Sequence, residues 1–347
     1  MRIEKLMTLV EQEKIDALVV DQVVDIYYLT GLDLSLGRLW VTPQGATLFV
    51  DGRYIEECRL HSPIPVELTQ GYGEKSTFFS SVKSKGKRLG FDTAISYESF
   101  RELEKLEAKL VPLEAPVMQL RLYKEEEELE KLQRAADLGV RGFKHILEVL
   151  EEGISETELA IELEVFWKRE GARHIGFDPI IAFGANSSKP HYRSGARRLA
   201  QGDIVLIDLG VVLDHYHSDM TRVHFFGDPA PEMKQIYAIV KEAQARALAT
   251  CAPGVEIKRV DLAARNYIAE RGFGEQFIHS LGHGLGLEVH ESPRLFHEGK
   301  FAQKKLEPGM VLTIEPGIYL PGKGGVRLED TVVITKNGYH NLTNCSL

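Results

Sequence analysis

The chain has 347 residues, of which 44% are hydrophobic, so it can build two domains of unequal size. Its 42 basic and 51 acidic side chains give a formal net charge of -9, which argues against an electrostatic grip on nucleic acid or anionic lipid. We expect no membrane span and no signal peptide. The three cysteines are widely spaced, which predicts neither disulfides nor a thiolate zinc site and favours a cytoplasmic protein.

Residues 1–118 alternate helical and extended patterns, which predicts a small α/β domain with a mixed sheet. An amphipathic N-terminal helix precedes strand-like segments at residues 15–20, 38–43, 46–51 and 88–92, and a helical pattern covers residues 96–110. Two prolines and a run of glutamates then change the pattern. We therefore expect a boundary near residue 118 and a second domain over residues 119–347.

The second domain also combines helices and strands. The glutamates at 125–128 begin a long helix, and we interpret them as a solvated first turn. Ser155 and Glu158 have the spacing of a capping box at the start of the next helix. Further helical patterns at 231–249 and 256–272 alternate with extended segments at 179–185, 205–223, 311–320 and 324–335. We expect these helices to cover one face of an antiparallel sheet.

Two aspartates interrupt the apolar hairpin pattern of residues 205–223. Asp208 and Asp219 have an odd separation and would face opposite sides of one continuous strand. A turn near residues 213–216 would instead bring both carboxylates to one place, where like charges repel unless they are protonated or bound to a cation. Aspartate is also common in turns, so this pair alone is weak evidence for a site.

Further ligand-type side chains follow towards the C-terminus. Glu315 and Glu329 each lie within a β-forming apolar run, and His283 alternates with three glycines between His279 and His290. The glycines allow close backbone approach, whereas a purely structural strand would lose stability from them. One imidazole and four carboxylates suit a pair of Mn²⁺, Co²⁺, Fe²⁺ or Zn²⁺ ions, because four carboxylates balance four positive charges.

Five motifs in this order resemble the pita-bread metallopeptidases, the family of methionine aminopeptidase, prolidase and aminopeptidase P. They are "IDLG", "HSDMTR", "GHGLGLEVHE", "IEPGIY" and "GVRLEDT". The resemblance implies an α+β fold, with a C-terminal pita-bread domain and the smaller α/β domain that prolidase, aminopeptidase P and creatinase share. It also implies short proline-containing peptides as substrates and a homodimer.

The resemblance assigns the metal ligands. It implies two divalent ions, with Mn²⁺ favoured over Co²⁺, Zn²⁺ and Fe²⁺, and the ligands Asp208, Asp219, His283, Glu315 and Glu329. Asp219 and Glu329 are expected to bridge both ions. Glu315 is also expected to transfer a proton from the attacking water to the leaving amine.

Residues that contact substrate follow from the same resemblance. His191 and His290 match family histidines that bind the substrate carbonyl and stabilise the oxyanion. Arg294 matches an arginine that meets a dipeptide's free carboxylate, and Phe177 matches a position used for substrate packing. Arg327 could orient the carboxylate of Glu329. The expected substrate-binding set is His279, Arg294, Arg327 and Phe177.

The favoured function is an Xaa-Pro dipeptidase. The alternative within the same chemistry is an aminopeptidase P, which releases the first residue of longer Xaa-Pro peptides. A non-catalytic pita-bread binding protein and a creatinase-like amidine hydrolase are disfavoured, because all five ligand positions are intact.

Overall fold

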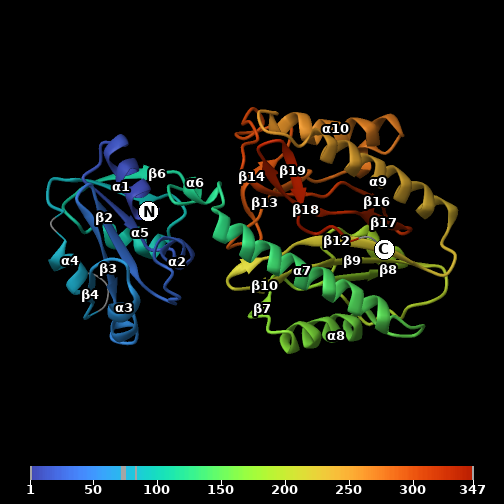
Figure 1. Cartoon of the computed structure of the whole chain (residues 1–347), viewed down its shortest axis with the longest axis horizontal. Coiled ribbons are helices and arrows are strands. Elements are labelled where there is room, and N and C mark those ends of the chain that lie inside the picture. Colours follow the sequence, from blue (N-terminus) through green and yellow to red (C-terminus); the bar gives the residue numbers. More distant parts are fainter. Residues whose placement is uncertain (1, 72–75, 83, 346–347) are drawn as a thin grey trace. The chain divides into compact units, whose positions relative to one another are not determined.

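The computed structural model describes residues 2–71, 76–82 and 84–345, and it contains two compact units, Met1–Arg121 and Leu122–Leu347 (Figure 1). The boundary expected near residue 118 lies at the start of the short helix α6 (Met118–Arg121). No helix in these described ranges is long and apolar enough to cross a membrane.

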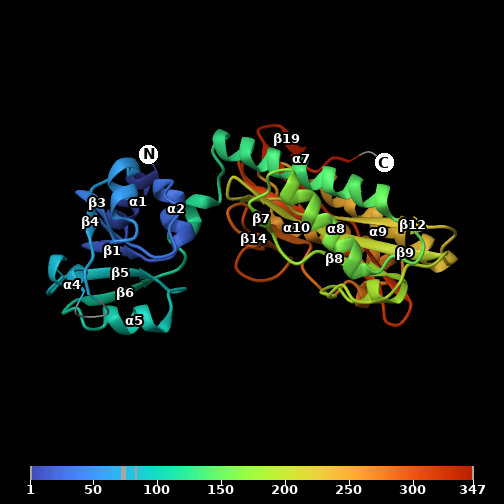
Figure 2. The ribbon, with the colours of Figure 1, turned by 90° about the horizontal axis from the view of Figure 1, so that it is seen from below.

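The N-terminal unit is built on a six-stranded mixed sheet with the order β4-β3-β2-β1-β5-β6. Its strands are β1 (Ala17–Val20), β2 (Arg38–Thr42), β3 (Gly45–Val50), β4 (Val66–Leu68), β5 (Arg88–Asp92) and β6 (Lys109–Leu113). Its other helices are α1 (Arg2–Gln12), α2 (Val23–Thr30), α3 (Ile55–His61), α4 (Thr77–Ser81) and α5 (Tyr97–Leu103). Phe91 of β5 packs on Phe100 of α5, which lies beside β5 and β6 (Figure 2).

The C-terminal unit contains four long helices and several short antiparallel sheets in its described residues. The helices are α7 (Glu126–Val149), α8 (Glu156–Arg169), α9 (Pro231–Thr250) and α10 (Ile257–Glu270), with short 3-10 turns η2 (Gly184–Ser188) and η3 (Gly274–Gln276). The first strands are β7 (His174–Ile175), β8 (Ile180–Phe183), β9 (Asp203–Leu209), β10 (Val211–Leu213), β11 (Tyr216–His217) and β12 (Met220–Phe226). The later strands are β13 (Gly282–Gly284), β14 (Glu291–Leu295), β15 (Val311–Ile314), β16 (Gly317–Leu320), β17 (Gly324–Arg327), β18 (Asp330–Thr335) and β19 (Gly338–Asn341).

Both faces of the β12-β9-β8 sheet are buried: α7 and α8 cover one face, as expected of helices on an antiparallel sheet, and β17 contacts β9 and β12 from the other core. Ile204 and Leu206 of β9 belong to the core that contains α9 and α10, whereas Val205 and Ile207 belong to the core beneath α7 and α8. Alternate residues of a strand point to opposite faces, so both faces of β9 are apolar and buried. Figure 1 shows α8 on one side of this sheet and β17 on the other.

Capping residues in the sequence determine where α7 and α8 begin. Ser155 and Glu158 form the expected capping box at α8. The glutamates at the start of α7 are only partly solvated, which corrects their interpretation as a solvated turn. Glu128 is 2% exposed because it caps the helix and accepts a hydrogen bond from the Tyr216 hydroxyl.

Candidate metal centre

The hairpin of β9 and β12 brings the two aspartates to one region, as the turn near residues 213–216 predicted. Asp208 lies opposite Thr221 in the register of β9 and β12. The hairpin continues through β10 and β11, where Asp214 and His215 make the turn with φ values of 48° and 71°. Asp219 lies one residue before β12, and its side chain is buried beside that of Asp208.

Two glutamates reach the same place from the neighbouring strands. An isolated antiparallel bridge joins Glu329 to Thr221, whose hydroxyl donates to Glu329 Oε2 at 2.6 Å. Glu315 follows β15, and its backbone N–H donates to the carbonyl of Leu281, just before β13, at 2.8 Å. The Thr313 hydroxyl donates to Glu315 Oε1 at 3.3 Å. Strands therefore hold both carboxylates, and a rigid strand fixes ligand geometry better than a mobile loop.

His283 lies at the centre of β13, between β14 and β15. The neighbouring glycines allow this close approach: a Cβ atom at Gly282 would lie 2.0 Å from the carbonyl oxygen of Thr313, and one at Gly284 would lie 2.2 Å from that of Ser292. His283 Nδ1 is 2.9 Å from the carbonyl oxygen of Gly284, which can only accept, so Nδ1 carries the proton. Burial lowers the pKa of His283 to about 4, so the ring is neutral.

The carboxylates repel one another in a buried environment. Burial, followed by the charge of Glu329, raises the pKa of Asp219 well above its ordinary value, and the same two causes raise the pKa of Glu315. Burial and the charge of Asp208 raise the pKa of Glu329 to about 8. Among the described residues, Asp208 Oδ1 is a buried oxygen without a hydrogen-bond donor.

This geometry fits a divalent cation. One ligand atom from each of Asp219, His283 and Glu329 can be chosen so that all lie within 4.8 Å of one another. The unprotonated Nε2 of His283 is 3.5 Å from Glu315 Oε1 and 3.7 Å from Asp219 Oδ2, so a lone pair faces carboxylate oxygens. That contact is unfavourable without positive charge between the atoms, and neutral imidazole and carboxylate are the forms that bind metal.

Arg327 is the buried cation beside the acids. Its guanidinium donates to Asp208 Oδ2, to the Tyr319 hydroxyl at 2.8 Å and to the Thr221 hydroxyl at 3.2 Å. The expected contact with Glu329 is therefore indirect, through Thr221, and the carboxylate that Arg327 binds is that of Asp208. Burial opposes its charge, but Tyr319, Asp208 and Glu315 keep the pKa of Arg327 well above its ordinary value.

Tyr319 and Thr221 were not predicted as site residues, although both lie in the motifs "IEPGIY" and "HSDMTR". The Tyr319 hydroxyl joins Arg327 to His279 Nε2, which is 2.9 Å away. Their roles depend on partners on other strands, so spacing along the chain carried no signal for them.

The three remaining histidines of the prediction gather beside the acids. The His290 ring lies 4.4 Å from that of His283, measured between centroids. Burial lowers the pKa of His290, and His191 lowers it further. Burial and then Arg327 lower the pKa of His279 to about 4, with a smaller effect of His191 in the same direction. His191 is thus close to both rings, and its side chain is exposed.

Phe177 and Arg294 lie on the borders of this region. A Cβ atom at Gly210 would lie 2.4 Å from the Phe177 ring, so Phe177 covers the backbone two residues after Asp208. Arg294 is exposed on β14, where it lies over the Phe296 ring with 5.5 Å between the guanidinium carbon and the ring centroid. Arg294 lies on β14, which begins directly after His290.

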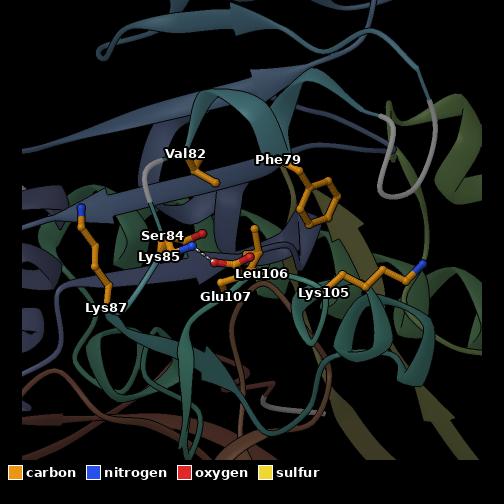
Figure 3. A pocket seen from close by; sticks show the side chains of 8 residues that line it. All are labelled: Phe79, Val82, Ser84, Lys85, Lys87, Lys105, Leu106 and Glu107. Carbon is orange, nitrogen blue, oxygen red and sulfur yellow. Dashed lines mark ion pairs between the residues drawn. The ribbon is translucent and has the colours of Figure 1, made fainter.

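A pocket of about 690 Å³ in the N-terminal unit has different chemistry (Figure 3). Its polar lining consists of Ser84, three lysines and Glu107, which pairs with Lys85 at 2.6 Å. It lacks a group of carboxylates and imidazoles, so the metal-binding chemistry lies in the C-terminal unit.

Buried carboxylates and a neutral imidazole on strands of a two-unit α+β chain define a metal-dependent hydrolase. Residues 130–336 match metallopeptidase family M24, and residues 2–123 match the creatinase/prolidase N-terminal domain. The chain belongs to metallopeptidase family M24. Membership confirms the expected fold, a creatinase-like α/β domain followed by a pita-bread domain, and it implies divalent metal ions. Membership makes the chain a metallopeptidase, in agreement with the expected hydrolase.

Relatives resemble the chain over almost its whole length. An Xaa-Pro dipeptidase of Pyrococcus horikoshii is 38% identical over 345 residues, which cover 99% of this chain and 96% of the relative. The structure of a prolidase from Pyrococcus furiosus has a TM-score of 0.92 at 37% identity, covering 98% of this chain and 100% of that one. An X-Pro aminopeptidase structure from Thermotoga maritima has a TM-score of 0.86 at 32% identity, covering 97% of each chain.

Proposed function

We propose that the chain is an Xaa-Pro dipeptidase that uses two divalent ions, with Mn²⁺ as the metal. The observation that carries the hydrolytic chemistry is the group of buried carboxylates around the neutral Nε2 of His283. The ligands would be Asp208, Asp219, His283, Glu315 and Glu329. The names of the similar dipeptidase and prolidase support the choice of substrate.

The ions, when bound, supply Lewis-acid chemistry that makes water nucleophilic near neutral pH. Glu315 is the residue that would move the proton, because its carboxylate has a raised pKa and lies 3.5 Å from His283 Nε2. His191 and His290 would donate hydrogen bonds to the substrate carbonyl oxygen as negative charge develops there. Both lie beside the acids rather than among them, which suits contact with substrate.

Arg294 would bind the free carboxylate of the dipeptide. Its exposure and its position on β14, which begins directly after His290, support this role. Arg294→Ala is therefore expected to raise KM for an Xaa-Pro dipeptide while changing KM for an amidated dipeptide little. Equal changes for both substrates would contradict the assignment.

The test of the proposed function compares an Xaa-Pro dipeptide with an Xaa-Pro-Yaa tripeptide. The protein is stripped with a chelator and refilled with Mn²⁺ before each assay. Metal-dependent cleavage of the dipeptide alone would support the dipeptidase. Preference for the tripeptide would favour the aminopeptidase P alternative, for which the similar Thermotoga maritima structure is the supporting observation. Cleavage of neither by metal-loaded protein would contradict both.

We also infer a homodimer in the cytoplasm. The dimer rests on the family resemblance, and light scattering at micromolar concentration tests it. The compartment is supported by three free cysteines, of which Cys58 and Cys251 are buried, since unpaired thiols suit a reducing environment. Labelled protein recovered outside the cytoplasm would contradict the second inference.

A further inference from the structure

A second buried carboxylate, outside the acid cluster, holds the segment that carries His191. Glu156 is the first residue of α8, and its side chain is completely buried. Its Oε1 accepts hydrogen bonds from the Phe183 N–H at 2.8 Å and from Asn186 Nδ2 at 3.0 Å. Its Oε2 accepts from the Tyr192 hydroxyl at 2.8 Å and from the Gly195 N–H at 3.0 Å. One carboxylate therefore satisfies four donors.

All four donors belong to residues 183–195, and His191 lies between them. The backbone of α8 adds to this attachment, because the Thr157 N–H donates to the Gly195 carbonyl at 3.0 Å. The Thr157 hydroxyl donates to the Ser194 carbonyl at 3.2 Å. The start of α8 thus fixes both ends of a segment that has little regular structure beyond the short turn η2.

The two residues next to His191 in sequence are held by hydrogen bonds to two different parts of the structure. The carbonyl oxygen of Pro190 accepts from Arg327 Nη1 at 3.4 Å, which connects it to the metal centre. Tyr192 donates to Glu156, and burial and this hydrogen bond raise the pKa of Tyr192 to about 12, so the phenol keeps its proton. The ring of His191 is exposed, so its position depends on how these two neighbours hold the backbone.

We propose that Glu156 is a positioning residue for His191, and this inference rests on the proposed role of His191 at the substrate carbonyl. An ionised carboxylate is required because it is an acceptor at both oxygens. Glutamine would replace one carboxylate oxygen with an NH₂ group, which is a donor. The two donors that this oxygen pairs with would then lack an acceptor in a buried site. The segment would then shift, and a displacement of about 1 Å can cost roughly 10²-fold in rate.

The test is a double-mutant cycle in the full-length protein loaded with Mn²⁺, with an Xaa-Pro dipeptide as substrate. His191→Ala, Glu156→Gln and the double variant are compared at a temperature well below their unfolding midpoints. Glu156→Gln is expected to lower kcat by about 10-fold to 10²-fold with little change in KM. The double variant is expected to match His191→Ala within about twofold, because a positioning residue has no effect once its target is gone.

Two further variants separate positioning from folding. Tyr192→Phe removes one donor and keeps the ring, so it should lower kcat several-fold even if Glu156→Gln does not fold, and its effect should also vanish in the His191→Ala background. Glu158→Gln, two residues along the same helix, alters the capping box without touching residues 183–195 and should leave kcat unchanged.

Each outcome has a distinct meaning. Multiplicative losses in the double variant, or full activity of both Glu156→Gln and Tyr192→Phe, would overturn the positioning role while leaving the role of His191 intact. Wild-type activity of His191→Ala would overturn the proposed carbonyl contact, and the positioning role with it.

Discussion

Two regions of the C-terminal unit bury acids in opposite ways. Glu291 has a partner of its own: Lys124 Nζ lies 3.0 Å from its Oε2, and both side chains are at most 2% exposed. The Leu287 N–H also donates to Glu291 Oε1 at 2.9 Å. In the candidate metal centre, four carboxylates lie together and the ion pair of Arg327 is with one of them, Asp208. A buried acid with its own cation is structural, whereas acids that face each other need a cation from solution.

The largest expected effect is the loss of turnover in Asp219→Asn. The substitution keeps the size of the side chain but removes a charge and a ligand that we propose for the metal. Activity should fall to below roughly a thousandth of wild type, because the metal chemistry is lost. The fold should survive, since a repelling charge is removed, and circular dichroism with metal analysis checks both statements. Asp228→Asn is the matched control at an exposed ion pair. Near-wild-type turnover and metal content in Asp219→Asn would contradict the site.

A smaller but still large effect is expected for Glu315→Gln. Glutamine can occupy the same volume and can still coordinate through its oxygen, but it cannot accept a proton. We expect kcat to fall by about 10²-fold to 10⁴-fold, which is the usual contribution of general acid–base catalysis. The measurement is kcat at saturating Mn²⁺, beside the metal content of the same sample. A normal kcat would assign the proton transfer to another residue.

How much of this site the sequence could predict depends on how far apart the interacting residues are. The turn at residues 213–216 makes the meeting of Asp208 and Asp219 predictable from local chemistry. Arg327, two residues before Glu329, was expected to orient the carboxylate of Glu329. Regular strand structure is interrupted between β17 and β18, however. The Arg327 guanidinium therefore donates to Asp208, 119 residues away in sequence. Lys124 and Glu291 are 167 residues apart and gave no signal.

The fold shows the same limit. The alternation of helical and extended patterns predicted an α/β unit followed by a second unit of helices and strands, because periodicity is local. The burial of both faces of the β12-β9-β8 sheet was not predicted, although β9 is buried at all seven positions. A continuous apolar run is the mark of a strand covered on both sides. Asp208 within β9 concealed that run, because an acidic residue is typical of a strand with one face exposed to solvent.

Glu291→Gln tests the structural half of the comparison. It leaves the Lys124 ammonium buried without its charge partner, which should lower the free energy of unfolding by about 3–5 kcal/mol. Urea unfolding measures this change. Glu298→Gln is the matched control, because Glu298 is 75% exposed beside His297 and should change stability by less than about 1 kcal/mol. Equal stability of the two variants would show that the Lys124–Glu291 pair is not structural.

The last expected effect is a pH dependence that appears only when metal is removed. The pKa of Glu329 is raised from 4.5 to about 8 in the folded protein, by burial first and by Asp208 second. Between these values the folded form holds a proton that the unfolded form has released, so the stability of stripped protein should fall as pH rises through this window. Each kcal/mol lost should lower the thermal midpoint by about 2–4 °C.

Thermal midpoints of chelator-treated protein at intervals between pH 5 and pH 8 measure this slope. Protein saturated with Mn²⁺ should lack it, because the metal holds the carboxylates ionised and so replaces the protons. Stripped Glu329→Gln should also show a weaker slope, since its amide does not titrate. Parallel profiles for stripped wild type and stripped Glu329→Gln would mean that Glu329 is already compensated within the folded chain, as Glu291 is by Lys124. Glu329 would then resemble the structural acid Glu291 rather than a carboxylate that needs a metal ion.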